Sequence, residues 1–194
     1  MAKIFDHIAP VFDLLYHRQR KGFKKSLDQA ASRLELDPSM SFIDLGCGTG
    51  ALTSVFRDRG LQVTGVDLSK KMIEYAARRP ENKSIQFIHA DASGQLPFPD
   101  KSFDVAFASF VAHGMKGPER MALYQEMKRL AKQRVIIRDY NSWRHPLISL
   151  IEWAERGDYF QFINVAEAEL TEVFGPIQVL EGSRWSSWYV CDPT

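Results

Sequence analysis

The feature that most constrains the fold is a glycine-rich turn after a short apolar stretch. Residues 42–50 read Phe-Ile-Asp-Leu-Gly-Cys-Gly-Thr-Gly, with glycine at positions 46, 48 and 50. Glycine suits a backbone that turns with unusual dihedrals or approaches a ligand closely. A helix that begins at Gly50 or Ala51 would aim free N–H groups at that ligand. The stretch therefore predicts a strand, a nucleotide-binding turn and a helix.

Two kinds of nucleotide cofactor fit this turn. Gly46-x-Gly48-x-x-Ala51 matches the loose dinucleotide pattern, and Asp67 stands about where an acid binds the ribose, roughly 20 residues on. The glycines alone therefore leave NAD open. Asp44 favours a different cofactor, because its carboxylate would face the phosphates of a dinucleotide but could hold the ammonium of a methionine moiety.

The turn resembles motif I of the class I S-adenosylmethionine (SAM) dependent methyltransferases, in which an acid precedes Gly-x-Gly-x-Gly. Three further segments are similar to the same family. Residues 66–72 resemble its second strand end and following helix, and residues 96–105 resemble the linker and fourth strand of a large small-molecule group. Residues 5–13 resemble the lead-in of the ubiquinone/menaquinone methyltransferases, with Phe12 where Tyr is common.

The resemblance implies SAM as the cofactor and assigns roles to particular residues. Asp44, Gly46 and Gly48 are expected to hold the methionine end, with Cys47 contributing its backbone N–H rather than its thiol. Asp67 is expected to bind the ribose hydroxyls. The adenine is expected to contact Leu68 and Met72 with its face, and Asp91 and Ala92 with its edge.

Strand-like and helix-like segments alternate along the chain, which predicts an α/β fold. The strands are expected at residues 41–45, 61–66, 84–89, 103–109 and 133–139. Such alternation gives a parallel sheet with helices on both faces, and ligands bind at the carboxyl ends of its strands. Ser109 and Phe110, which close the fourth strand, are therefore expected beside the cofactor.

Residues 177–180 and 185–190 are two more predicted strands, and the four residues between them are too few for a crossover helix. They must pair antiparallel. The expected fold is thus a Rossmann-like, doubly wound sheet of seven strands, mostly parallel with a C-terminal antiparallel hairpin. Such a hairpin is typical of class I methyltransferases and is absent from the usual six-stranded NAD fold.

Composition narrows the class of substrate. A chain of 194 residues with 45% hydrophobic content suits a single domain, 1–194. Its net charge of +1 gives no field that attracts nucleic acid, so a small-molecule acceptor is expected. Two cysteines, no signal-peptide-like start and no long apolar run predict a cytoplasmic protein without a membrane span. No metal site and no oligomeric state are predicted.

Two flanking segments, residues 1–37 and about 140–165, are not required by the sheet. The family builds a cover over SAM and the substrate pocket from such segments, and both are aromatic. An apolar pocket for a planar or hydrophobic acceptor is expected, although aromatic helix faces also form plain core. The pocket residues proposed from the sequence are Phe12, Tyr16, Tyr140, Trp143 and Tyr159.

A second feature of the N-terminal flank is its charge. Arg18, Arg20, Lys21, Lys24 and Lys25 form a basic run. Such a run either attracts an anionic substrate or membrane surface, or is a solvated helix face.

Methyl transfer from a sulfonium depends mainly on positioning the acceptor in a water-poor site. An acceptor hydroxyl, amine or carbon acid must also lose a proton. His113, just after the fourth strand, is the best-placed base, and its alternative role is structural. Three functions follow: a small-molecule methyltransferase, a non-catalytic SAM-binding protein with the same cofactor residues, and an NAD oxidoreductase.

Overall fold

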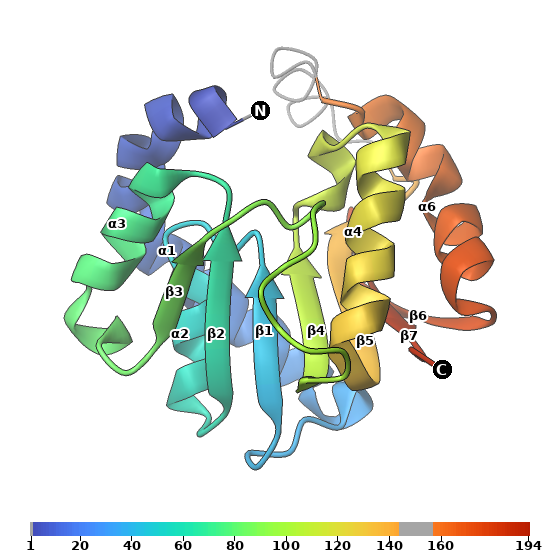
Figure 1. Cartoon of the computed structure of the whole chain (residues 1–194), viewed down its shortest axis with the longest axis horizontal. Coiled ribbons are helices and arrows are strands. Elements are labelled where there is room, and N and C mark those ends of the chain that lie inside the picture. The colour runs from blue at the N-terminus through green and yellow to red at the C-terminus, as the bar shows by residue number, and fades with distance from the viewer. Residues whose placement is uncertain (1, 144–156) are drawn as a thin grey trace. The chain divides into compact units, whose positions relative to one another are not determined.

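The structure is a computed structural model that describes residues 2–143 and 157–194. The chain divides into two compact units, residues 1–92 and 93–194. Its seven strands form a mixed sheet with accompanying helices, as the alternating pattern predicts (Figure 1). None of the helices within the described ranges is both long and apolar enough to cross a bilayer.

The first unit contains three parallel strands in the order β3-β2-β1. In this sheet Asp44 pairs with Gly65, and Asp67 pairs with His89. All three strands lie within two residues of their predicted bounds. The elements of this unit are α1 (Ala2–Leu34), β1 (Ser41–Leu45), α2 (Ala51–Asp58), β2 (Gln62–Asp67), α3 (Lys70–Arg78), the 3-10 helix η1 (Pro80–Asn82) and β3 (Gln86–His89).

Helix α1 runs for 33 residues and packs against α2 and α3 (Figure 1). Its buried apolar residues are Ala9, Tyr16, Leu27, Ala30 and Leu34, whose spacings fit one face of a helix. The apolar spacing from Phe23 to Leu34 predicts only the C-terminal half of this helix. Pro10 removes one backbone hydrogen bond from the N-terminal half, where Ala9 and Tyr16 are nevertheless buried.

The second unit contains four strands in the order β4-β5-β7-β6. Strands β4 and β5 are parallel, and β7 runs antiparallel to both of its neighbours. The predicted C-terminal hairpin is therefore confirmed. The elements are β4 (Phe103–Ser109), the 3-10 helix η2 (Ala112–Gly114), α4 (Gly117–Leu130), β5 (Ala131–Tyr140), α6 (Tyr159–Phe174), β6 (Ile177–Ser183) and β7 (Ser186–Cys191).

Two details of this unit differ from expectation. Strand β6 continues to Ser183, so the hairpin link is shorter than the predicted four residues. Gly182 permits this, because a Cβ there would stand 3.0 Å from the indole nitrogen of Trp188. Helix α6, which was not predicted from the sequence, packs against α4. The apolar spacing of residues 147–154 also predicts a helix, and those residues lie outside the described ranges.

Candidate functional site

The glycine turn after β1 is closed by hydrogen bonds to the end of β2. The N–H groups of Gly46 and Cys47 both donate to the carbonyl oxygen of Val66, at 2.8 and 3.0 Å. Gly46, Gly48 and Gly50 all have positive φ, at 77°, 55° and 76°, where glycine is favoured. A Cβ at Gly48 would have no atom within 4 Å. The turn therefore leaves open space above Gly48 that a ligand could occupy.

Asp67 fixes this turn from the neighbouring strand. Its Oδ2 accepts the backbone N–H of Gly48 at 2.8 Å, and its Oδ1 accepts that of Ser69 at 2.8 Å. Burial raises the pKa of Asp67, while these two N–H groups and nearby His89 act in the opposite direction. Each carboxylate oxygen has a second lone pair. The side chain can thus hold the protein loops together and still accept hydrogen bonds from two ligand hydroxyls.

Asp44 lies at the buried end of β1 with only 1% of its surface exposed. Its Oδ2 accepts the hydroxyl of Thr53 on α2 at 2.7 Å. Burial raises the pKa of Asp44 to about 7, the hydroxyl of Thr53 lowers it, and the charge of Asp67 raises it further. A buried carboxylate with one neutral donor favours a cationic partner. Sequence reasoning missed Thr53, which lies nine residues from Asp44 on another element and belongs to no short motif.

The start of α3 is tied to the N-terminal part of α1. Ser69 caps α3, because its Oγ accepts the N–H of Met72 at 3.2 Å. The same hydroxyl donates to Asp6 of α1 at 2.6 Å, and this bond lowers the pKa of Asp6. Met72 is buried and Leu68 is half-buried. The predicted adenine-face residues therefore lie on either side of Ser69, which Asp6 of α1 holds in place, a contact that sequence reasoning also missed.

The remaining predicted cofactor residues of the first unit differ in exposure. Asp91 is exposed just beyond β3, and Ala92 is buried. Cys47 is buried, and burial raises the pKa of its thiol well above the usual range, so the thiol stays protonated. Its N–H is engaged by Val66, as described above. Contacts of these residues with a cofactor stay predictions.

In the second unit, His113 forms a buried pair with Asp139. His113 lies on η2, after β4, and Asp139 lies near the end of β5. The Nδ1 atom of His113 is 2.7 Å from Oδ1 of Asp139, and the His113 backbone N–H donates to Oδ2 at 3.3 Å. Asp139 is fully buried, and His113 is 9% exposed. A carboxylate on Nδ1 fixes the imidazole with its proton there, which leaves Nε2 as the basic nitrogen.

Aromatic rings surround this pair. The ring of Tyr140 is centred 4.7 Å from that of His113, and the rings of Phe110 and Phe162 lie at 6.4 and 6.5 Å. Tyr159 packs on Tyr140 at 5.1 Å. The predicted residues Tyr140 and Tyr159 therefore join the predicted base in one cluster.

The other three predicted pocket residues lie elsewhere. Trp143 is 57% exposed, and the guanidinium of Arg184 stacks on it at 4.8 Å. Tyr16, in the first unit, is fully buried on the inner face of α1, with the guanidinium of Arg79 over its ring at 4.3 Å. Phe12 is half-buried on the same helix. Tyr16 thus has a packing role, whether or not it also faces a ligand.

Arg120 contacts the aromatic cluster through Phe162, whose ring centre is 5.8 Å from its guanidinium. Its side chain is fully buried and donates to the carbonyl of Met115 at 2.5 Å, to Asp158 at 2.7 Å, and to both carboxylate oxygens of Glu169. It thereby joins the loop after η2 to the N-cap residue of α6 and to a residue in the C-terminal half of that helix. No local sequence pattern indicates this role of Arg120, because its partners are 38 and 49 residues away.

Two observations bear on a bound ligand in the second unit. The hydroxyl of Ser109 is buried and has no hydrogen-bond partner among the residues that the structure describes. Phe110, which follows it, has a positive φ of 55°, a conformation that costs energy for a bulky side chain. Ser109 and Phe110 are the two residues that the sequence predicts beside the cofactor. A strained backbone and an unsatisfied buried hydroxyl are typical of ligand sites.

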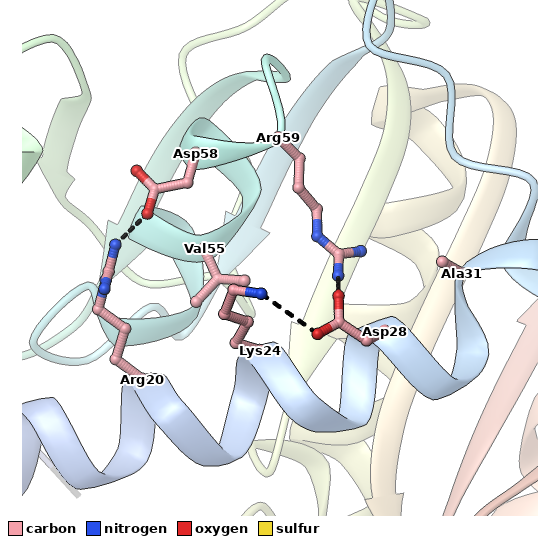
Figure 2. Close-up of a pocket in the computed structure, with 7 residues that line it drawn as sticks. All are labelled: Arg20, Lys24, Asp28, Ala31, Val55, Asp58 and Arg59. Carbon is pink, nitrogen blue, oxygen red and sulfur yellow. Dashed lines mark hydrogen bonds and ion pairs between the residues drawn. The ribbon is translucent and has the colours of Figure 1, made fainter.

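A pocket of about 490 Å³ lies at the surface between α1 and α2 (Figure 2). None of the predicted cofactor or pocket residues lines it. Its charges are paired. Arg20 of α1 pairs with Asp58 of α2, Arg59 just after α2 pairs with Asp28 of α1, and Lys24 pairs with Asp28 within α1. Across residues 2–143 and 157–194 no group of three or more metal-ligating side chains occurs.

Similarity to known proteins extends over much of the chain. Residues 43–137 match a methyltransferase domain family. A demethylmenaquinone methyltransferase of Paenarthrobacter aurescens is 31% identical over 156 residues, 77% of this chain and 57% of that protein. A malonyl-[acyl-carrier protein] O-methyltransferase of Serratia marcescens is 31% identical over 57% of this chain and 41% of its own length. The chain thus spans about half the length of these relatives.

Solved structures show the same fold. A Pyrococcus horikoshii protein superposes with a TM-score of 0.73 at 23% identity, over 88% of this chain and 89% of the other. The magnesium protoporphyrin IX methyltransferase of Synechocystis, solved with bound S-adenosylhomocysteine, superposes with a TM-score of 0.65 at 20% identity, over 89% and 84%.

Proposed function

We propose that this chain, which belongs to the class I SAM-dependent methyltransferases, transfers a methyl group to a small apolar or aromatic acceptor. The main support for the proposal is the hydrogen bond that the backbone N–H of Gly48, in the glycine turn, donates to Asp67. It leaves a carboxylate with spare lone pairs beside open space at the carboxyl ends of two parallel strands, where such sheets bind ligands.

The cofactor roles proposed from the sequence fit the residues present. Buried Asp44 would hold the ammonium of the methionine end, and a cation there would stabilise its charged form. Asp67 would accept the two ribose hydroxyls, and Gly48 would allow close approach of the ligand. Leu68 and Met72 would contact the adenine. When bound, SAM supplies a methyl group already activated by the sulfonium.

His113 is proposed as the base that removes the acceptor's proton. Asp139 holds Nδ1 of the imidazole at 2.7 Å, which directs the basic Nε2 away from the carboxylate. A positioned base of this kind contributes roughly 10²- to 10⁴-fold to a reaction rate. Proton transfer to Nε2 would accompany formation of the new bond to the methyl carbon.

The acceptor class is inferred from the rings around His113. Tyr140, Tyr159, Phe110 and Phe162 form a cluster that suits a planar or apolar molecule carrying one acidic proton. The relatives that are named for a menaquinone precursor or for a protoporphyrin act on molecules of that kind. We propose the same chemical class here, with no nucleic-acid substrate, in a single cytoplasmic domain covered by residues 1–37 and about 140–165.

A non-catalytic SAM-binding protein would share every cofactor residue, so turnover separates the two functions. The protein is incubated with SAM that carries a deuterated methyl group and with a panel of quinols, phenols, porphyrin acids and nucleic acids. Mass spectrometry then detects the labelled product. The proposal expects S-adenosylhomocysteine formation that depends on an apolar aromatic acceptor. Cofactor binding with no turnover on any such acceptor would support the non-catalytic alternative.

A further inference from the structure

The outer face of α1 carries an unusual arrangement of side chains. Residues 7, 11, 14, 18, 21 and 25 are spaced by three or four, so they share one side of the helix. Val11 and Leu14 are 54% and 83% exposed. Arg18, Lys21 and Lys25 follow them along the same side and are also exposed. We call the five residues from Val11 to Lys25 on this side the outer stripe.

The three cations of the outer stripe have no partner within residues 2–143 and 157–194. No residue that the structure describes forms an ion pair or side-chain hydrogen bond with Arg18, Lys21 or Lys25. The cations beside the stripe behave differently, because Arg20 and Lys24 pair with carboxylates of α2 and α1 (Figure 2). Within the basic run, Arg20 and Lys24 are therefore neutralised by carboxylates, and the three cations of the outer stripe are not.

The acids of α1 do not offset the outer stripe. The helix has only three acids, and each is engaged by another element of the first unit. Asp6 accepts the Ser69 hydroxyl, Asp13 pairs with Arg79, and Asp28 pairs with Arg59. The outer stripe thus presents two aliphatic side chains and three positive charges without a negative charge between them.

We propose that the outer stripe docks the protein on the anionic surface of a lipid bilayer. Val11 to Lys25 spans about 21 Å of helix. The aliphatic end would enter the boundary between headgroups and acyl chains, where exposed apolar side chains leave water. The cationic end would lie against anionic headgroups. A nucleic acid or an acidic protein segment would use the cations, but a polyanion offers no apolar layer for Leu14.

This inference is independent of the proposed function, since it rests on α1 alone. The two fit together, because apolar acceptors dissolve in membranes and a docked enzyme meets them there. Failure of one test leaves the other intact: vesicle binding is measured without SAM or acceptor, and turnover is measured with detergent-dispersed acceptor.

Sedimentation with sucrose-loaded vesicles tests the charges. The wild-type chain is expected to bind vesicles of phosphatidylcholine with phosphatidylglycerol, to bind neutral phosphatidylcholine vesicles weakly, and to dissociate in high salt. Each cation near such a surface is worth about fivefold in partition. The variant that combines Arg18→Gln, Lys21→Gln and Lys25→Gln should therefore bind anionic vesicles at least about tenfold more weakly than the wild type. The matched control neutralises three exposed cations outside α1, by Arg78→Gln, Lys83→Gln and Lys132→Gln, and should bind like the wild type.

A single-site probe tests insertion of the aliphatic end. Both native cysteines are buried, so Leu14→Cys gives one accessible thiol for an environment-sensitive fluorophore. A blue shift with anionic vesicles is expected at that position and not at the control Ser84→Cys. Leu14→Ser should weaken vesicle binding. Three results would overturn the proposal: no binding to anionic vesicles, equal loss in both charge variants, or binding to double-stranded DNA or polyglutamate in place of vesicles.

Discussion

Asp139 receives two hydrogen bonds from His113 and one from Tyr140, and the one from His113 Nδ1, at 2.7 Å, orients a catalytic candidate. The other two come from the backbone N–H groups of His113 and Tyr140. A fully buried carboxylate that accepts three N–H groups has a fixed position. The imidazole is therefore held rigidly, as a general base requires.

Replacing His113 should slow the methyl transfer and leave cofactor affinity intact. We expect His113→Ala to lower kcat by about 10²- to 10⁴-fold, because the acceptor keeps its proton. The dissociation constant of S-adenosylhomocysteine, measured by calorimetry, should stay the same. His17→Ala is the control, since His17 is an exposed histidine of α1 and should turn over normally. An unchanged kcat in His113→Ala would assign His113 a structural role.

Two alanine substitutions at positive-φ glycines should separate strain from ligand contact. Gly48 and Gly60 have φ values of 55° and 86°. A Cβ would meet no atom within 4 Å at Gly48, and at Gly60 it would meet Cβ of Pro38 at 3.5 Å, an ordinary contact without a clash. Each variant should lose about 1 to 2 kcal/mol of unfolding free energy in urea titrations. Only Gly48→Ala should also weaken binding of S-adenosylhomocysteine, by at least about tenfold, because its new methyl group fills the open space above the turn. If the two variants bind S-adenosylhomocysteine equally well, the ligand does not lie against Gly48.

The buried Asp44 predicts a pH effect on stability. Its pKa is raised to about 7 in the folded protein, so the folded state holds a proton that the unfolded chain has already lost. The free energy of unfolding should therefore fall as pH rises from about 4 to about 7, by up to about 4 kcal/mol. Asp44→Asn should remove most of this slope in denaturant titrations.

The same raised pKa predicts proton release on ligand binding. A ligand ammonium beside Asp44 favours the charged carboxylate, so binding near pH 6 should release up to about one proton. Calorimetry in buffers of different ionisation enthalpy measures this number. If Asp44→Asn releases as many protons as the wild type, the ammonium does not lie at Asp44.

Arg120 should be a larger determinant of stability than a surface cation. Arg120→Met leaves the carboxylates of Asp158 and Glu169 without their buried partner, which should cost about 3 to 5 kcal/mol in urea unfolding. Arg78→Met breaks an exposed pair with Glu74 at 3.9 Å and should cost less than about 0.5 kcal/mol. Similar costs for the two variants would mean that Arg120 is not a structural tie.

What the sequence predicted well was local. The strand bounds, the glycine turn and the antiparallel hairpin follow from spacing and loop length, which act over a few residues. The seven-stranded α/β fold is confirmed on this basis.

What it missed depends on packing between distant segments. The bond between Asp6 and Ser69 joins residues 63 apart, and Thr53 reaches Asp44 from another element. The spacing of apolar residues along the chain gives no information on such contacts between distant segments. Helix α1 continues past Pro10 because its inner face is buried, so tertiary packing outweighed local propensity.

The ribose contact of Asp67 is the most direct test of the whole account. Calorimetry compares S-adenosylhomocysteine and NAD as ligands of the wild type and of Asp67→Ala. We expect the wild type to bind S-adenosylhomocysteine and not NAD. We expect Asp67→Ala to lose at least about a hundredfold in affinity, because two ribose hydroxyls lose a charged acceptor and the turn at Gly48 loses its anchor. Binding of NAD in preference, or unchanged affinity in Asp67→Ala, would contradict the account.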